Sequence, residues 1–597
     1  MASQDVSGGT GGCPLVVCLA DEPAPNAGRT SAYHSYLVEI LQHAGLFFST
    51  VPPADLPSAL PAASILVTCG ETTPPNDVRE AIREWVLGGG SWISIAGLWN
   101  LEDLFGVRPR PAVTQSSFAA GAVSMGEGYL EPVDKAHPVT AALNSPLHFF
   151  NGRAVEETGC RVLARALDAH RKGVTGPALT ENGAGSGRCL LIAPDLTGTV
   201  VRIQQGVAIT RDGVPAPDGS APVSDGVLKS DDGLVLDWDF DRDEIPGVPG
   251  LRAFLRPVAD LWRDLLVRAI LDCAAASEVA LPLVWFHPEG WEAVAHMSND
   301  TDLSDPDCAE EMLNTLAEAG IRSTWCNILP PYPPGIIERM KQAGHEAAMH
   351  YDAISEGRGW SREEFLRQHS DISRALDEAP VSNKNHYLRW EGDTEFFEWL
   401  AAAGVTLDQS KGASKTGVAG FNFGTCHLYF PVAPDGRLLD VLELTTPTQD
   451  LVVFAPEELV DALIPRVREV YGVLHLLFHP AHIKKPPVRQ ALLSAVRKAR
   501  EAGMEWFTAA EISRWERARR QVRWSGYARE VDGISVQVAA GAPLERAALM
   551  WLAPSGGEAL LDGEPCASFV TERWGRRFAG CIVDLEPGRP VRFQLRG

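Results

Sequence analysis

The sequence predicts an α/β protein of several domains, and three observations support this class. Its 597 residues are enough for three or four domains, each with a hydrophobic core of its own. Short apolar runs alternate with amphipathic stretches over residues 14–210 and again over 281–517, which is typical of parallel strands covered by helices. From residue 518 onward, short apolar segments separated by Gly and Pro predict an antiparallel β-sandwich.

The first region, 14–210, follows a Gly-rich stretch, 1–13, that we expect to be disordered. Its pattern predicts apolar strands at 14–20, 63–68 and 91–96, with amphipathic helices at 33–44 and 77–87. Strand and helix in this order favour a doubly wound sheet of parallel strands with helices on both faces.

A connector, 211–280, carries acidic clusters and ends in a long helical pattern. The region 281–517 then alternates helices with short apolar strands, for example at 323–327, 347–349 and 474–478. This alternation predicts a distorted (β/α) barrel, in which chemistry takes place at the carboxyl ends of the strands. Residues 518–597 form the predicted β-sandwich.

The composition excludes several classes of function. The formal charge of −24 repels phosphate backbones, so we expect no nucleic-acid partner. No window reaches the roughly 18 apolar residues of a membrane helix, and the N-terminus lacks the pattern of a secretory signal. Eleven cysteines without CxxC pairs indicate reduced thiols. We therefore expect a cytoplasmic protein without a membrane partner.

Ionisable side chains gather at four predicted strand ends. The segments are SNDTD (298–302), GHEAAMHYD (344–352), NHYLRW (385–390) and FHPAH (478–482). The two carboxylates of the first segment, Asp300 and Asp302, can divide the work of a base and a metal ligand. In the second segment His350 stands at the strand end, and His345, Glu346 and Asp352 add further groups able to bind a metal.

Region 290–517 resembles the polysaccharide deacetylase (NodB-homology) superfamily, which includes carbohydrate esterase family 4. The resemblance rests on six segments in the family's order: SNDTD, LAEAGIRSTWCN (316–327), MKQAGHEAAMH (340–350), NHYLRW, LDQS (407–410) and HLLFHPAH (475–482). It implies roles for six residues: Asp300 as general base, Arg389 as the residue that orients it, His479 as general acid, Asp408 as the support of His479, and Asp302 and His350 as metal ligands. The implied cofactor is a divalent metal, zinc first, with cobalt, nickel or manganese as alternatives.

The third metal ligand departs from the family pattern. The family places a histidine four residues after the first, where this sequence has Ile354. Three residues are candidates to replace it: His386, Asp352 and His482. We favour His386, because NHYLRW already belongs to the predicted site, and we expect Asp352 to cap the following turn. Without a replacement, the barrel would be catalytically dead.

Region 14–210 resembles the glutamine-amidotransferase-like domains, whose sheet is flavodoxin-like. The supporting segments are VREAIREWVLGGGSWISIAG (78–97), AHPVTAAL (136–143) and NGAGSGRCLLIAPDL (182–196). In catalytic members a cysteine follows the strand that SWISIA would form, but here the sequence is Ala96-Gly97-Leu98. We therefore predict a non-catalytic scaffold or binding module, in which Cys69 has no catalytic role.

Together these resemblances predict a metal-dependent amide hydrolase that removes an acyl group, most often acetyl, from an N-acylated sugar or sugar conjugate. One alternative is hydrolysis of a small non-sugar amide, as in the allantoinase-like relatives. Another is a dead barrel that binds carbohydrate. Trp325, Trp360 and Trp390 either stack on sugar rings or pack in the core. The flanking domains are expected to shape the substrate groove or a homo-oligomer interface.

Overall fold

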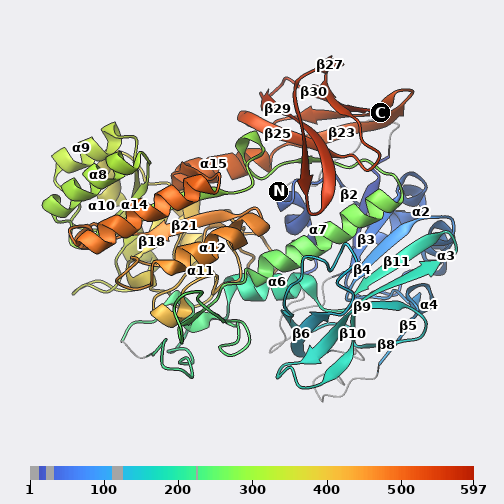
Figure 1. Cartoon of the computed structure of the whole chain (residues 1–597), viewed down its shortest axis with the longest axis horizontal. Coiled ribbons are helices and arrows are strands. Elements are labelled where there is room, and N and C mark those ends of the chain that lie inside the picture. The colour runs from blue at the N-terminus through green and yellow to red at the C-terminus, as the bar shows by residue number, and fades with distance from the viewer. Residues whose placement is uncertain (1–11, 22–32, 111–124, 224–225) are drawn as a thin grey trace. The chain divides into compact units, whose positions relative to one another are not determined.

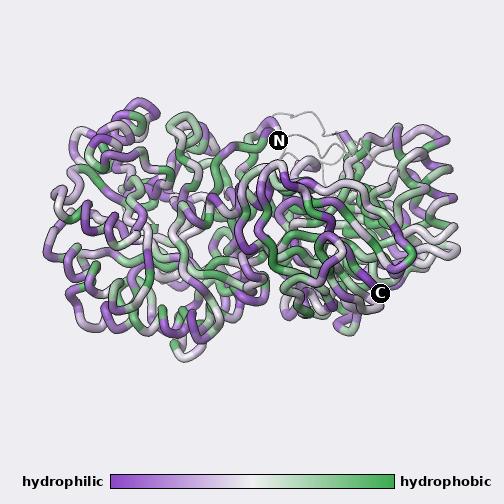
Figure 2. The backbone as a smooth tube through the Cα atoms, turned by 90° about the horizontal axis from the view of Figure 1, so that it is seen from above, coloured by the Kyte–Doolittle hydropathy of each residue, from purple (hydrophilic) through white to green (hydrophobic). Residues whose placement is uncertain are grey.

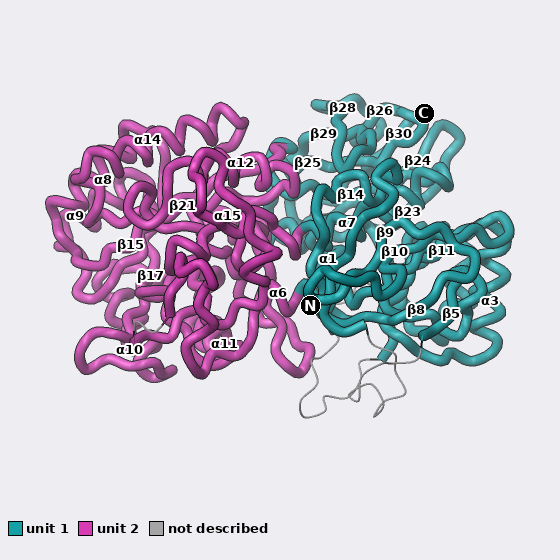
Figure 3. Tube along the Cα trace, turned by 60° about the horizontal axis from the view of Figure 1, so that its bottom comes forward, with its two compact units in different colours: residues 1–200, 261–290, 517–597 teal, residues 201–260, 291–516 magenta. Residues whose placement is uncertain are grey.

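The computed structural model describes residues 12–21, 33–110, 125–223 and 226–597 (Figure 1). Most of the segment predicted to be disordered, 1–13, lies outside these residues. The chain divides into two compact units, shown in Figure 3. Unit 1 comprises residues 1–200, 261–290 and 517–597, and unit 2 comprises 201–260 and 291–516. Each unit collects segments that are distant in sequence, so the predicted linear domain boundaries remain predictions.

Unit 1 contains a nine-stranded mixed sheet in the order β2-β1-β3-β4-β11-β10-β9-β6-β7. The strands are β1 (Leu15–Leu19), β2 (Ser49–Thr50), β3 (Ile65–Cys69), β4 (Ser91–Ile95), β6 (Glu127–Pro132), β7 (Leu147–Phe150), β9 (Arg161–Asp168), β10 (Val174–Ala184) and β11 (Gly187–Ile192). The half from β2 to β11 is parallel, and the other half is antiparallel. The parallel half is the predicted one, because its apolar runs are buried on both faces of the sheet.

Helices of unit 1 follow the strands of the parallel half. They are α1 (Tyr36–His43), α2 (Leu56–Ala59), α3 (Asn76–Leu87), α4 (Glu102–Phe105) and α6 (Leu196–Gln205), the last of which continues into unit 2. Two short strands, β5 (Val107–Pro109) and β8 (Val155–Glu157), pair separately. The long helix α7 (Val258–Ala276) likewise begins in unit 2 and continues in unit 1.

The C-terminal residues of unit 1 form two antiparallel sheets. One has the order β14-β25-β29-β28 and the other β23-β24-β30-β26-β27. Their strands are β14 (Pro282–Val284), β23 (Arg523–Glu530), β24 (Gly533–Ala539), β25 (Leu544–Leu552), β26 (Glu558–Leu561), β27 (Glu564–Pro565), β28 (Ala567–Arg573), β29 (Arg576–Leu585) and β30 (Val591–Arg596). Trp551 of β25 stacks on Phe593 of β30 with ring centroids 5.2 Å apart, so the two sheets pack face to face.

Unit 2 is built on a parallel sheet in the order β20-β19-β18-β17-β16-β15-β21, and β22 also pairs with β15. The strands are β15 (Val294–Asp300), β16 (Thr324–Asn327), β17 (Glu346–Tyr351), β18 (Ser382–Asn385), β19 (Leu407–Asp408), β20 (Leu442–Glu443), β21 (Val473–Leu477) and β22 (Glu505–Phe507). Among the described residues β20 and β21 stand at the two edges, so the sheet is an open half-barrel. All these pairings are parallel, so every strand's carboxyl end lies on the same side.

Helices connect these strands, as the alternating pattern predicts. They are α8 (Pro306–Ala319), α9 (Pro334–Gln342), α10 (Arg362–Leu376), α11 (Glu395–Ala402), α12 (Glu458–Glu469), α13 (Pro480–Ile483), α14 (Pro486–Glu501) and α15 (Ala509–Arg519). Their starts follow local chemistry: the carboxylate of Asp305 accepts the N–H of Asp307 at 2.9 Å and so caps α8.

Figure 2 shows hydrophobic and hydrophilic stretches alternating along the chain in place of one long hydrophobic segment. In the part of the chain that the structure describes, no helix combines the length and apolar character needed to span a bilayer.

Candidate active site

The carboxyl ends of four strands of unit 2 bring the predicted site residues together. Asp300 is the last residue of β15, and Asp302 follows it by two positions. His350 stands near the end of β17, and His386 directly follows β18. His479 comes just after β21. Parallel pairing therefore places five polar groups from four separate segments at one edge of the half-barrel.

Asp302, His350 and His386 form a cluster with the donor set of a metal site. The Nε2 atom of His350 lies 3.2 Å from Asp302 Oδ1, and His386 Nε2 lies 3.8 Å from Asp302 Oδ2. One ligand atom from each residue lies within 4.8 Å of the other two. Two imidazole nitrogens and one carboxylate are the ligands that zinc commonly takes in hydrolases, so these residues fit a divalent ion.

The outer nitrogens of both histidines are held by acceptors. His350 Nδ1 donates to the backbone oxygen of Lys384 at 2.9 Å, and His386 Nδ1 donates to Asp352 Oδ1 at 3.2 Å. Each Nε2 lone pair is thereby directed to the cluster, which is how outer partners fix a metal-binding tautomer. Burial alone raises the pKa of Asp302, but the hydrogen bond with His350 and the charge of His479 outweigh it and lower that pKa well below its usual range.

Asp352 is fully buried and serves the turn, as expected. Its Oδ1 accepts the N–H groups of Ile354 at 2.9 Å and Ser355 at 3.2 Å, and its Oδ2 pairs with Arg358 at 2.5 Å. The same Oδ1 accepts His386 Nδ1. Asp352 therefore positions His386 from behind, and its other contacts, with Ile354, Ser355 and Arg358, lie outside the Asp302 cluster.

His479 lies beside the cluster and is held by Asp450, not by Asp408. Its Nε2 is 3.6 Å from Asp302 Oδ2, its backbone N–H donates to Asp450 Oδ1 at 2.8 Å, and its Nδ1 donates to Asp450 Oδ2. His482 Nδ1 lies 3.2 Å from the same carboxylate. Burial lowers the pKa of His479, but Asp450 outweighs this and raises it to about 9.

Asp408 differs from its predicted position as the partner of His479. It lies inside the half-barrel, where it accepts Asn383 Nδ2 at 2.8 Å and the Ser410 hydroxyl at 2.9 Å. Its buried neighbour is Glu443. Burial raises the pKa of Asp408, and it raises that of Glu443 well above the usual value, so the two carboxylates do not both ionise readily.

Arg389 also differs from its predicted contact with Asp300. Its guanidinium donates to the backbone oxygen of Ala353 and, through Nε at 3.0 Å, to Glu391. The cation beside the predicted base is Lys384, whose Nζ lies 3.6 Å from Asp300 Oδ1. Lys384 is fully buried on β18 and donates to the Ser298 hydroxyl at 2.5 Å.

Sequence reasoning missed Lys384 and Asp450. Lys384 immediately precedes the NHYLRW segment, and its place next to a predicted site segment was the one usable signal. Asp450 lies in an irregular stretch after β20, and its sequence context carries no comparable signal.

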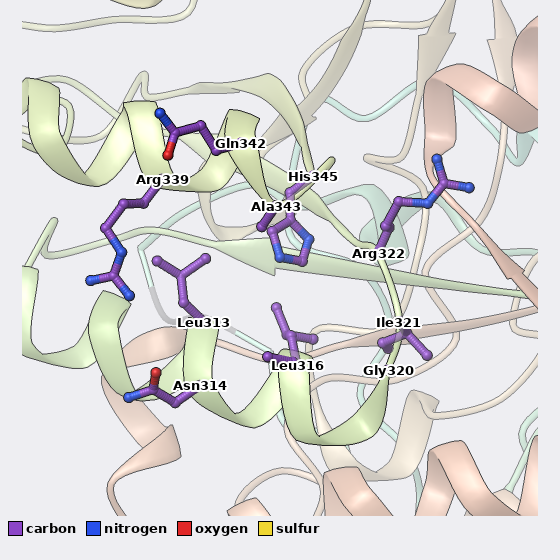
Figure 4. Close-up of a pocket in the computed structure, with 11 residues that line it drawn as sticks. Leu313, Asn314, Leu316, Gly320, Ile321, Arg322, Arg339, Gln342, Ala343 and His345 are labelled. Carbon is purple, nitrogen blue, oxygen red and sulfur yellow. The ribbon is translucent and has the colours of Figure 1, made fainter.

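His345 and Glu346 belong to the other end of β17 and not to this site. His345 Nδ1 accepts the N–H of Ser323 at 3.0 Å, and burial lowers its pKa to about 4. His345 lines a separate cavity of about 530 Å³ between α8 and α9, shown in Figure 4. The high density of metal-capable groups in GHEAAMHYD is therefore split between the two ends of one strand.

In unit 1, the turn after β4 lacks a nucleophilic side chain. Ala96 adopts φ 53°, a left-handed conformation that is strained for a residue with a Cβ. The Glu71 carboxylate accepts the N–H groups of Leu98 and Trp99, both at 2.9 Å. Cys69 is buried, with Sγ 3.6 Å from the Thr197 hydroxyl.

Comparison with known proteins gives little beyond this geometry. No family model and no curated protein matches the sequence. Among solved structures, a protein assigned as a polysaccharide deacetylase from Mycobacterium smegmatis shares 18% identity at a TM-score of 0.31, over 40% of this chain and 93% of that one. The allantoinase PuuE shares 14% identity at a TM-score of 0.29, over 38% and 90%. A protein from Bordetella bronchiseptica, assigned as a polysaccharide deacetylase of O-antigen biosynthesis, shares 16% at 0.23, over 35% and 86%. These TM-scores are too low to carry an argument, so the interpretation rests on the site itself.

Proposed function

We propose that the protein is a metal-dependent hydrolase that cleaves amide bonds and so removes an acyl group from nitrogen. One observation carries the proposal. Asp300 and the His479–Asp450 pair both lie beside the Asp302–His350–His386 cluster at the carboxyl edge of a parallel sheet: His350 Nε2 is 3.9 Å from Asp300 Oδ2, and His479 Nε2 is 3.6 Å from Asp302 Oδ2. A metal-binding set, a base and an acid are the groups that hydrolysis of an amide requires.

Each residue has a distinct part. Asp302, His350 and His386 hold the divalent ion, for which zinc is favoured and cobalt, nickel and manganese are alternatives. When bound, the ion supplies Lewis-acid chemistry: it lowers the pKa of water and polarises an acyl oxygen. Asp300 accepts the proton of the attacking water, and Lys384 holds that carboxylate in place.

His479 supplies the proton for the departing nitrogen. Its pKa of about 9 keeps the imidazole protonated at neutral pH, and Asp450 fixes Nδ1 so that the Nε2–H is directed to the cluster. Protonation turns a poor leaving group into a neutral amine, which is the step that amide hydrolysis needs most.

The three tryptophans of this region do not favour a sugar as the substrate. Trp325 and Trp390 are fully buried, and Trp360 packs in the same aromatic cluster as Trp390. Their role is core packing rather than stacking on a ring of the substrate. An N-acylated sugar stays the substrate implied by the sequence resemblance, and a small non-sugar amide is the second candidate.

The test combines a measurement of metal content with an assay of amide hydrolysis. Elemental analysis of the purified chain should give about one divalent ion, which Asp302→Ala should lose. Asp300→Asn should keep the ion yet lose amide hydrolysis, because the amide oxygen cannot take the proton from water. Failure to bind any metal after reconstitution, together with binding of glycans, would instead favour the dead carbohydrate-binding barrel.

A further inference from the structure

Exposed apolar side chains flank the candidate site at three positions along the chain. Leu303 directly follows Asp302 and Tyr387 directly follows His386, and Val452, Val453 and Phe454 begin two residues after Asp450. Isolated apolar residues at a surface need no explanation, but exposed apolar residues that follow three separate site residues in the chain do. We refer to these five residues as the apolar rim.

Phe454 ties the rim to the predicted acid. The centroid of its ring lies 6.4 Å from that of His479 and 5.9 Å from that of His482. Its segment is fixed to Asp450, whose backbone oxygen accepts the N–H groups of Phe454 at 2.9 Å and Val453 at 3.2 Å. Asp450 therefore holds His479 through its carboxylate and positions this part of the rim through its backbone oxygen.

The backbone of the rim adopts unfavourable conformations. Val452 has φ 72° and Tyr387 has φ 59°, a region that residues with a Cβ seldom occupy and that is worst for a β-branched side chain. Strain of this kind persists where surrounding structure enforces it, and it concentrates at functional sites. Val452 and Tyr387 have this conformation, and their apolar side chains are exposed to solvent at the edge of the site. The hydrophobic effect alone would favour their burial.

We propose that the apolar rim binds an apolar group carried by the amine side of the substrate amide. This inference rests on the proposed function. His479 protonates the departing nitrogen, so a substituent on that nitrogen lies beside His479 and hence beside Phe454. Three of the five rim residues are aliphatic and offer no partner to sugar hydroxyls. The rim therefore selects an alkyl or aryl amine over an unsubstituted amino sugar.

The experiment compares acetamides that differ only in the amine. The full chain, loaded with zinc, is assayed on N-acetylglucosamine, N-acetylbutylamine, N-acetylhexylamine and acetanilide. We expect kcat/KM to rise with chain length by up to about fourfold per methylene, the value for full burial of that group. Phe454→Ser and Val453→Ser should abolish most of this rise while keeping the metal.

Val381→Ser is the matched control. Val381 is 39% exposed against 37% for Phe454 and 38% for Val453, but it precedes β18 and so lies at the amino end of the half-barrel. The control should retain the full dependence on chain length. Equal kcat/KM across the series, or an unchanged slope in both rim variants, would overturn the inference and leave the proposed function intact. Absence of hydrolysis of every amide by the metal-loaded chain would overturn the proposed function and this inference with it.

Discussion

Replacement of His386 by alanine decides whether this residue is the third metal ligand. Its Nε2 lies 3.8 Å from Asp302 Oδ2, and its Nδ1 is engaged by Asp352. Four-ligand zinc sites bind with about 10–16 kcal/mol, so one ligand contributes about 2.5–4 kcal/mol. His386→Ala should therefore weaken zinc binding about 100- to 1,000-fold. Titration of the apo protein with zinc against a chromophoric chelator measures this directly.

Two further variants sharpen the result. Asp352→Asn keeps an oxygen able to accept from His386 Nδ1 but loses the negative charge, so affinity should fall about 10- to 100-fold, as for other outer partners of metal ligands. His482→Ala is the control, because His482 contacts Asp450 and not the cluster, and it should bind zinc like the wild type. Wild-type affinity in His386→Ala, combined with a loss in His482→Ala, would refute the assignment.

Three other predictions concern the acid, the base and the interior. Asp450→Asn should lower kcat by about 10²- to 10⁴-fold. Asp450→Asn should also move the alkaline limb of the pH–kcat profile below its wild-type position near 9, because His479 loses the negative charge that raises its pKa. An unmoved limb would contradict this. Lys384→Met should lower kcat by about 10²-fold with the metal retained, because the base Asp300 would be misplaced. A larger loss in Arg389→Met would show that Arg389, and not Lys384, positions Asp300. Burial raises the pKa of Glu443, so between the ordinary pKa of a glutamate and this raised value the unfolded chain has lost the proton that the folded chain keeps, and stability falls as the pH rises. Glu443→Gln should therefore raise the thermal midpoint more at pH 8 than at pH 5, with about 1.4 kcal/mol for each pKa unit that burial adds; an equal change at both pH values would count against it.

The sequence pattern was sufficient to predict several strands and the residues that stand at their ends. Apolar runs mark β3, β4, β17 and β21, because strands buried on both faces contain little else. Asp300 and His479 stand at such ends, and parallel pairing alone brings strand ends together.

Contacts that depend on irregular backbone could not be predicted in this way. Asp450 reaches His479 only because the chain between β20 and α12 folds back to the carboxyl edge. Lys384 lies on a regular strand, β18, but the polar sequence SNKN has no apolar alternation to show which way its side chains point. Arg389, five residues later, has the expected chemistry but lies in a turn that directs it to Glu391.

The turn after β4 lacks two features that acyl chemistry at this position would need. Its backbone is still bent, with Ala96 at φ 53°, yet a methyl group cannot attack a carbonyl carbon. Acyl transfer also needs free N–H donors for the developing oxyanion. The N–H groups of Leu98 and Trp99 stand in that neighbourhood, but the Glu71 carboxylate accepts both at 2.9 Å. An oxyanion at this turn would have to displace a negative charge from its donors. The turn therefore lacks both the nucleophile and the free donors that the resemblance associates with catalysis, and a non-catalytic N-terminal region stays a prediction.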